Sequence, residues 1–370
     1  MRRLLVNGRF LAAPQSAVNQ VAQSLTCALA EAGPTRGWNV VLAVPADLAG
    51  PARALGLRLR VAGQGTGALW DQRVLPGLRR EGVVAGFFNT VPLTGRGYIT
   101  LLHDAHVFTT PASYPAPVRL WRQVLARRAG APGNLLLTVS EHARARIAAA
   151  GIAPAERIGV VPNGPGPVAT SRAAPDALVR LGLSDRPYCV AQASRLPHKN
   201  LDLILRAFSD PRLKGVDLVL TGGPSAGRDG AVLRTGFLDL PDLAALYDGA
   251  LAVCVPSREE GFGLPALEAM ARGTVPLVAK AGALPEVVGP AGRVLPVDDP
   301  SAWVEAILAL RNAPELRAAL VETGRRRAAD FSWSRSAEAC LDLLDGWVVS
   351  PRRSGRLSGR LGRLGALPGV

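Results

Sequence analysis

The chain has 370 residues, 48% of them hydrophobic, and a formal net charge of +14. Its length predicts two domains, and its apolar content is enough to fill two cores. The longest uncharged run, residues 10–30, is long enough to span a bilayer but too polar, and residues 1–7 hold too short an apolar run for a signal peptide. We therefore expect a cytoplasmic protein with no membrane-spanning helix.

The positive charge indicates an anionic partner, for which anionic lipid, nucleic acid and an anionic sugar nucleotide are the candidates. No basic strip is interleaved with aromatic residues, and no zinc-finger or RNA-recognition motif is present, so we expect no nucleic-acid partner. Residues 349–370 are rich in arginine and glycine. We expect a mobile basic tail there, and the alternative is a helix on an anionic membrane, at the inner face of the plasma membrane.

The cysteines and histidines show no metal-binding pattern. Four cysteines lie far apart in the sequence, and the four histidines lack the spacing of a zinc site. We expect no metal and no cofactor, and buried free thiols in a reducing compartment.

The first half begins with a strand over residues 3–7, a loop, a helix whose apolar residues run from Val18 to Leu29, and a second strand over 40–44. This order is typical of a Rossmann-like domain, although the loop lacks the glycine pattern that binds dinucleotides. Further strands are predicted at 83–88, 98–102, 134–140 and 158–161, and helices after Ser140 and over 120–128.

His103 and Asp104 follow the strand that ends near residue 102. A histidine in such a loop is as often structural as functional, and Asp104 is placed to orient its ring. For His106 the structural interpretation is favoured. Residues 162–175 contain several prolines, and this composition predicts a linker.

The second half repeats the alternation of strands and helices. Two cations, Arg195 and Lys199, lie in a loop ahead of a helix over 201–208, an arrangement that suits a diphosphate but is also common in solvated loops. The other predicted strands are 188–191, 216–220, 250–255 and 276–279, and the other predicted helices are 243–247, 301–310 and one ending near residue 347.

The stretch from Arg258 to Gly273 follows a buried strand and contains a glycine loop. Pro265 fits the first turn of a helix, and Gly273 fits its end. In a parallel sheet such a loop lies at the carboxyl end of its strand, where ligands bind, and the helix start would face an anion. Each of the two acids of the stretch, Glu260 and Glu268, could by itself be an ordinary surface carboxylate.

The wording Glu-Gly-Phe-Gly-Leu-Pro-x-Leu-Glu-Ala-Met, from Glu260 to Met270, resembles the Glu-x7-Glu motif of retaining glycosyltransferases of the GT-B fold, family 4 (group 1). Val-Ser-Glu at 139–141, Val-Val-Pro-Asn-Gly ending at Gly164 and Gly-Phe-Leu from Gly236 resemble the same family, so the resemblance covers roughly residues 1–348. It implies two Rossmann-like, doubly wound parallel-sheet domains facing across a cleft.

The resemblance also implies roles for individual residues. Glu260 would bind the transferred sugar near its anomeric carbon, His103 would contact that sugar, and Lys199 with Arg195 would neutralise the leaving diphosphate. Glu268 would hold the ribose hydroxyls. Other donor contacts would come from Gly222, Gly236, Phe237, Gly261, Phe262, Gly263 and Leu264, and weaker sugar or acceptor contacts from Asn7, Ser16, Asp104 and Asn163.

The sequence departs from the family pattern at three places. Ser16-Ala17 stands where a glycine is usual, Arg195 and Lys199 are one residue closer than usual, and Lys280-Ala281 replaces Ser-Asn. The predicted domains are an acceptor domain over 1–168, a linker over 169–186, a donor domain over 187–330, and a helix over 331–348 that crosses back.

We expect a metal-independent retaining hexosyltransferase that moves a sugar, with mannose as the expected hexose, from a nucleotide diphosphate to a saccharide or lipid-linked acceptor, in surface polysaccharide or glycoconjugate synthesis. The alternatives are another GT-B sugar-nucleotide enzyme, such as an epimerase or phosphorylase, and a non-enzymatic basic binding module. A glycoside hydrolase also uses two carboxylates, but it needs no phosphate-binding features.

Overall fold

The computed structural model describes residues 1–13, 16–184, 186–194, 196–223 and 225–349. The chain forms two compact units, and it passes from one to the other after Gly164 and again after Phe331. Of the predicted linker over 169–186, the described residues 169–184 and 186 belong to the second unit, where α8 (Ala177–Arg180) forms. Arg195 and the basic tail from residue 350 onward lie outside the described residues.

The first unit contains a seven-stranded parallel sheet in the order β3-β2-β1-β4-β5-β6-β7. The long apolar runs of its strands are buried, as expected for a parallel sheet covered by helices. Its strands are β1 (Arg2–Asn7), β2 (Trp38–Val44), β3 (Leu59–Val61), β4 (Val83–Gly86), β5 (Tyr98–Leu101), β6 (Leu135–Thr138) and β7 (Ile158–Val160).

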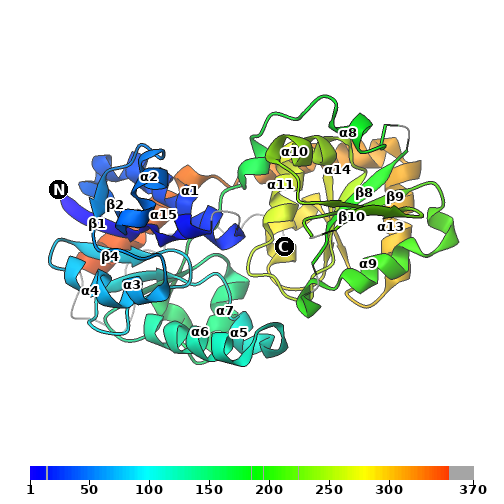
Figure 1. The fold of residues 1–370 in the computed structure, drawn as a ribbon. Helices are drawn as coiled ribbons and strands as arrows, with labels where there is room; N and C mark the ends of the chain where they lie inside the picture. Colours follow the sequence, from blue (N-terminus) through cyan, green and yellow to red (C-terminus); the bar gives the residue numbers. More distant parts are fainter. Residues whose placement is uncertain (14–15, 185, 195, 224, 350–370) are drawn as a thin grey trace. The chain divides into compact units, whose positions relative to one another are not determined.

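Helices of the first unit connect these strands and include the C-terminal described helix. They are α1 (Ala17–Ala32), α2 (Ala49–Arg53), α3 (Ala68–Arg73), α4 (Leu75–Leu78), α5 (His106–Thr109), α6 (Ala116–Ala129), α7 (Glu141–Ala149) and α15 (Trp333–Val349). The last of these, orange in Figure 1, packs beside α1. Its Asp345 accepts hydrogen bonds from Arg2 (2.6 Å), Arg36 (2.8 Å) and the indole nitrogen of Trp38 (2.9 Å).

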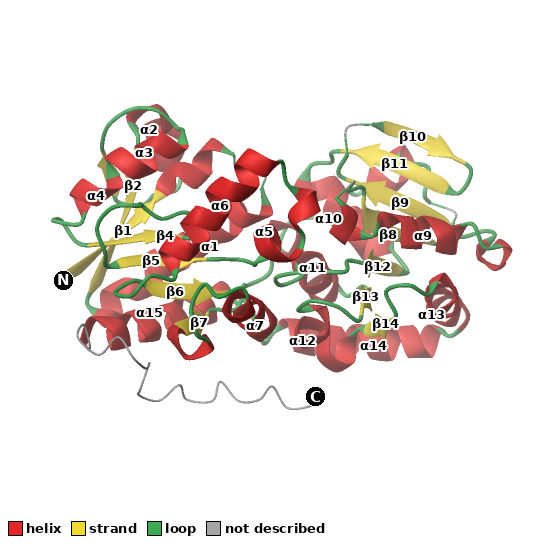
Figure 2. Cartoon of the chain, turned by 90° about the horizontal axis from the view of Figure 1, so that it is seen from below, coloured by secondary structure: helices red, strands yellow, loops and turns green. Residues whose placement is uncertain are grey.

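The second unit contains a seven-stranded sheet in the order β10-β11-β9-β8-β12-β13-β14, which Figure 2 shows strand by strand. All pairs are parallel except β10 with β11 at one edge. The strands are β8 (Tyr188–Gln192), β9 (Asp217–Thr221), β10 (Ala226–Asp229), β11 (Val232–Gly236), β12 (Ala252–Val255), β13 (Val275–Ala279) and β14 (Arg293–Leu295).

The helices of the second unit include the one predicted after the glycine loop. Besides α8 they are α9 (Leu201–Phe208), α10 (Leu240–Gly249), α11 (Leu264–Arg272), α12 (Leu284–Val288), α13 (Pro300–Asn312) and α14 (Pro314–Ala328). The predicted α/β class with two doubly wound sheets is therefore confirmed. None of the helices in the described ranges is long and apolar enough to cross a membrane.

Candidate functional site

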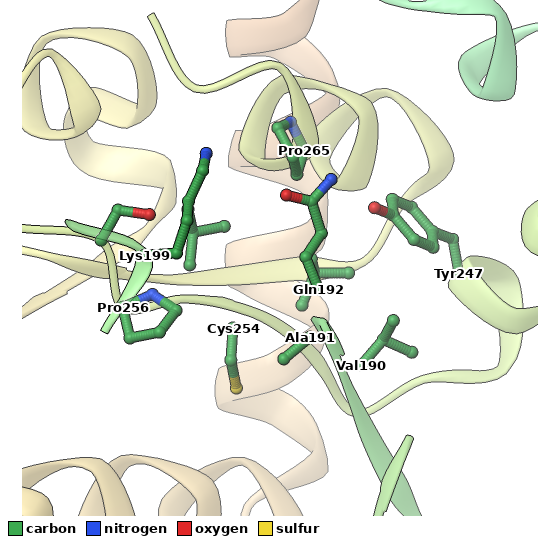
Figure 3. A pocket seen from close by; sticks show the side chains of 11 residues that line it. Val190, Ala191, Gln192, Lys199, Tyr247, Cys254, Pro256 and Pro265 are labelled. Atoms are coloured by element: carbon green, nitrogen blue, oxygen red, sulfur yellow. The ribbon is translucent and has the colours of Figure 1, made fainter. Parts of the chain in front are cut away.

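An open hollow lies at the carboxyl ends of β8 and β12 in the second unit. These neighbouring strands are where the strand order reverses, because β9 lies on one side of β8 while β13 follows β12 on the other. Ligands of open α/β sheets bind at such a switch point. Figure 3 shows the polar ends of Lys199, Gln192 and Tyr247 extending toward the side on which Pro265 lies, whereas Cys254 points the opposite way.

Lys199 and Ser257, which line this hollow, both bond to Glu260. The Lys199 ammonium lies 2.6 Å from Oε1 of Glu260, and the Ser257 hydroxyl donates to the same oxygen at 2.7 Å. Both donors stabilise a negative charge on the carboxylate, which is buried with 8% of the residue exposed. Sequence motifs indicated Lys199 and Glu260 separately, but nothing in the sequence indicated that they pair or that Ser257 bonds to the same carboxylate.

A left-handed residue fixes the turn that carries Lys199. Asn200, which follows it, has φ 53°, and its side-chain amide donates to the carbonyls of Pro256 (3.1 Å) and Val297 (2.9 Å). Asparagine tolerates this conformation better than most residues. The two bonds tie the loop after β8 to the chain after β12, at Pro256, and to the chain after β14, at Val297, so the ammonium is held on a fixed backbone.

The backbone of Glu260 is held just as closely. Gly282 has φ 61°, and a Cβ there would lie 2.5 Å from the backbone nitrogen of Glu260. The neighbouring Ala283 donates its N–H to the Glu260 carbonyl at 3.0 Å. Gly282 is thus a supporting residue that sequence reasoning missed, and its only signal was a glycine between two loop residues.

The helix α11 starts and ends as predicted. Gly263 caps it with φ 104°, Pro265 lies in its first turn beside the hollow, and Gly273 ends it with φ 77°. The first N–H groups of a helix lack partners within it, so the start of α11 suits an anion at the hollow. The predicted donor residues Gly261 and Leu264 lie in this loop and at the first position of the helix.

The ring of Phe262 is buried and does not line the hollow. It packs edge to face on Phe331, with ring centroids 5.8 Å apart and an interplanar angle of 84°. Only the backbone of Phe262 could therefore make the predicted donor contact. Its ring anchors the glycine loop to the core of the unit.

Glu268 lies one turn into α11. Burial raises the pKa of its carboxyl to about 8, so the free protein holds it largely protonated at neutral pH. Burial and then the charge of Glu268 raise the pKa of the nearby Tyr247 well above its usual value. The two acids of the motif are therefore in different electrostatic environments.

Gly222, Gly236 and Phe237 lie at the ends of β9 and β11. Gly222 (φ 73°) donates its N–H to the carbonyl of Gly236 (φ 71°) at 2.9 Å, so both glycines are required for this turn. Phe237 follows with 82% of its surface exposed. An apolar ring so exposed at a ligand-binding edge is available to a flat partner such as a nucleobase.

His103, in the first unit, is buried and neutral. Its Nε2 lies 2.9 Å from the carbonyl of Phe87. Because a carbonyl only accepts, Nε2 carries the proton and Nδ1 is left as an acceptor. Desolvation lowers the pKa of the ring, while the Phe87 carbonyl and the charge of Asp104 act in the opposite direction. Asn89 (φ 60°) also accepts the His103 backbone N–H at 2.9 Å.

The expectation that Asp104 orients the His103 ring is wrong. The Asp104 carboxylate instead accepts from the backbone N–H of His106 (2.9 Å) and faces its Nδ1 (3.4 Å). The reason is geometric, because α5 begins at His106 and Asp104 bonds to the first turn of that helix. His106 itself is buried, in line with its predicted structural role.

Asn7 has a structural role in the first unit. Its amide donates to Asp71 (2.9 Å), and its oxygen accepts from the N–H of Arg9 (3.1 Å). Asp71, which sequence reasoning missed, is buried and also accepts from the Arg9 guanidinium (2.8 and 2.9 Å) and from Thr90 (2.7 Å). This network holds the loop after β1 in place. The sequence showed Asp71 only as an acid in a short helix, which did not indicate the network.

The remaining predicted acceptor residues are also in the first unit. Ser16 is the N-cap residue of α1, is exposed, and makes no capping bond with its side chain. Asn163 is buried after β7. The structure describes each unit by itself, so the roles of these residues and of His103 toward the second unit remain predictions.

The sequence is similar to a family of glycosyltransferases and to individual proteins named as such. The family model described as "Glycosyl transferases group 1" matches residues 187–312. The D-inositol 3-phosphate glycosyltransferase of Salinispora arenicola is 36% identical over 204 residues, which are 48% of this chain and 46% of the relative. The MMP alpha-(1->4)-mannosyltransferase of Mycolicibacterium hassiacum is 32% identical over 249 residues, which are 60% and 59%. The chain thus spans about half the length of the curated relatives it matches.

Solved structures resemble nearly the whole chain. Sucrose-phosphate synthase from Thermosynechococcus elongatus has a TM-score of 0.72 at 18% identity, covering 95% of this chain and all of that one. Anabaena HepE in complex with UDP-glucose has a TM-score of 0.68 at 17% identity, covering 93% and 99%. At such identities the likeness shows the fold, and it agrees with the two-sheet architecture described above.

Proposed function

We propose that this chain, which is a GT-B glycosyltransferase of group 1, moves a hexose from a nucleotide-diphosphate sugar to a saccharide or lipid-linked acceptor with retention of anomeric configuration. The observation that carries the proposal is the Lys199–Glu260 pair at the switch-point hollow, beside the start of α11. A cation, a carboxylate and the positive end of a helix together suit a substrate that is anionic at its diphosphate and electron-poor at its sugar.

The leaving diphosphate concentrates negative charge as the glycosidic bond to it breaks. Lys199 is the described cation at the hollow and, with the start of α11, would stabilise that charge. These fixed charges would do the work that a divalent cation does elsewhere, so we propose a metal-independent reaction. Arg195 is proposed to assist, and it lies outside the described residues.

The carboxylate of Glu260 is proposed to face the sugar. It is buried, negatively charged and held by Lys199 and Ser257, so it would stabilise positive charge that develops at the anomeric carbon. Glu268 is proposed to hold the ribose hydroxyls of the donor, for which a carboxyl group can both donate and accept. Because one curated relative is named as a mannosyltransferase, mannose remains the hexose that we propose.

A lipid-linked acceptor or an anionic membrane surface would suit helix α6. The helix has four arginines and no acid, and it leaves Leu120, Trp121 and Val124 exposed by 62%, 37% and 39%. An exposed apolar stripe on a basic helix favours a lipid headgroup layer. Flotation with phosphatidylglycerol vesicles tests this proposal, and a Leu120→Glu chain that floats as well as the original would contradict it.

The donor proposal is tested by thermal shift with UDP-, GDP- and ADP-sugars. A bound donor at about 100 times its Kd should stabilise the protein by about 2.7 kcal/mol. Product analysis with a labelled donor then separates transfer from epimerisation and phosphorolysis. If none of the donors stabilises the chain, the donor site is refuted and the non-enzymatic binding module becomes the better interpretation.

A further inference from the structure

Gly166 lies against the carboxyl group of Glu268, within the second unit. A Cβ built on Gly166 would lie only 1.9 Å from Oε1 of Glu268, and the next nearest atoms are Cδ (3.0 Å) and Cγ (3.6 Å) of the same side chain. The backbone of Gly166 (φ −72°, ψ 173°) is one that any residue adopts. Glycine is therefore needed here for room and not for backbone freedom.

The segment that carries Gly166 is fastened to α11. Arg272 donates from Nη1 to the carbonyls of Val168 (3.1 Å) and Ser171 (2.7 Å). Its guanidinium is held in turn by both oxygens of Asp248. Because Arg272 lies four residues after Glu268, both side chains are on one face of the helix. The segment thus cannot retreat from the carboxyl without breaking these bonds.

We propose that Gly166 is a positioning residue, which leaves the space that the carboxyl of Glu268 needs in order to meet the donor. The proposal rests on the proposed function, in which Glu268 binds the donor ribose. An ordinary C···O contact is about 3.4 Å, so a methyl group at residue 166 would displace the carboxyl by about 1.5 Å. A displacement of about 1 Å in a binding group can cost up to about a hundredfold in activity.

The displacement should alter binding more than folding. The atom in the way is the end of a flexible side chain, which can change rotamer, whereas the backbone of Gly166 needs no change. A carboxyl moved toward water would also lose the burial that raises its pKa to about 8. A purely structural role for Gly166 predicts neither a selective loss of donor affinity nor a shift in its pH dependence.

The test is Gly166→Ala, with Gly77→Ala as the matched control. Gly77 is an exposed residue of α4 with nothing within 4 Å of its would-be Cβ. The ligand is whichever of UDP, GDP or ADP stabilises the original chain most, and its Kd is measured by calorimetry between about pH 6 and about pH 9. We expect Gly166→Ala to raise the Kd at least about tenfold, to lower the pH at which affinity changes, and to leave the melting temperature near that of Gly77→Ala.

A double-mutant cycle separates this proposal from the proposed function. If Glu268→Ala leaves the Kd unchanged, the assigned role of Glu268 is wrong. If Glu268→Ala weakens binding but Gly166→Ala does not, the positioning proposal alone is overturned. If both substitutions weaken binding, we expect Gly166→Ala to raise the Kd by less than about twofold in the Glu268→Ala background, because no carboxyl remains to be displaced. If the rise in Kd of the double variant instead equals the product of the two single rises, the proposal is overturned.

A folding failure of Gly166→Ala would also be informative. Glu268→Asp shortens the acid by one methylene group and makes room for the added methyl group. If the clash with the carboxyl causes the failure, the Gly166→Ala/Glu268→Asp chain folds. If that chain also fails to fold, the space at Gly166 serves something other than the carboxyl, and the proposal is overturned.

Discussion

Replacing Glu268 by glutamine should remove a pH-dependent loss of stability from the second unit. The carboxyl has a pKa of about 8 in the folded chain, against 4.5 for an unperturbed glutamate. Between these values the folded state keeps a proton that the unfolded state has released, so the free energy of unfolding falls as the pH rises. The stability that the protonated acid contributes is complete below about pH 4.5 and is lost through pH 8.

The size of the effect follows from the same interval. Each unit of pKa difference corresponds to about 1.4 kcal/mol, so the whole interval could supply at most about 5 kcal/mol. Glu268 is only half-buried as a residue, and water reaching the ionised group would reduce this loss. We expect a decline of about 2 kcal/mol in the original chain between about pH 5 and about pH 8.5, and none of this decline in Glu268→Gln.

The assay is urea unfolding followed through Trp303, the only tryptophan between residues 165 and 331. It is fully buried, and its indole N–H donates to the Pro296 carbonyl at 2.9 Å, so its fluorescence reports on the second unit. A Trp303→Phe chain supplies the background from the first unit. Glu315→Gln, an exposed acid at the start of α14, is the matched control. If the original chain and Glu268→Gln lose stability in parallel, burial does not raise the pKa of the Glu268 carboxyl.

Three further substitutions have definite expected outcomes. Lys199→Ala removes the ammonium group that pairs with Glu260. It should lower the turnover of a nucleotide sugar, measured by product formation, by about a hundredfold or more. An undiminished rate would contradict the role of Lys199. Gly263→Ala places a side chain at φ 104° and 2.6 Å from Leu284, and should destabilise the second unit by about 1–3 kcal/mol in urea unfolding. Asp71→Ala leaves buried donors without their acceptor and should destabilise the first unit by about 3–5 kcal/mol, visible as a lower melting temperature.

Helices and strands could be predicted from the sequence wherever the apolar periodicity agrees with residues that start or end an element, such as proline and glycine. The helix over 201–208 is found with the predicted bounds, and α11 begins and ends at the glycines and proline that predicted it. The antiparallel strand β10 was missed because its four residues are all exposed, so they show no alternation. Helix α14 was missed because it is largely polar around its circumference and buries only a few side chains.

The candidate site was predictable only as a set of residue types. Sequence spacing located Lys199 and Glu260, which are 61 residues apart in the chain and joined by a 2.6 Å ion pair. Their pairing depends on which strands are neighbours, and no local pattern specifies the order of strands in a sheet. Contacts made by small residues, such as Gly166 against Glu268, depend on absent side-chain atoms and leave no positive signal in a sequence.

The two acids of the motif are eight residues apart, yet their surroundings give them opposite electrostatic properties. Glu260 receives an ammonium and a hydroxyl hydrogen bond, which stabilise its anionic form, whereas burial favours the neutral form of Glu268. A pair of carboxyl groups separated in this way can serve two tasks at one pH. The anion suits an electron-poor sugar carbon, and the protonated acid suits hydroxyl groups, to which it can donate as well as accept. The division of roles proposed for Glu260 and Glu268 therefore follows from their contacts, and an assay in which the two neutral variants had the same pH dependence would refute it.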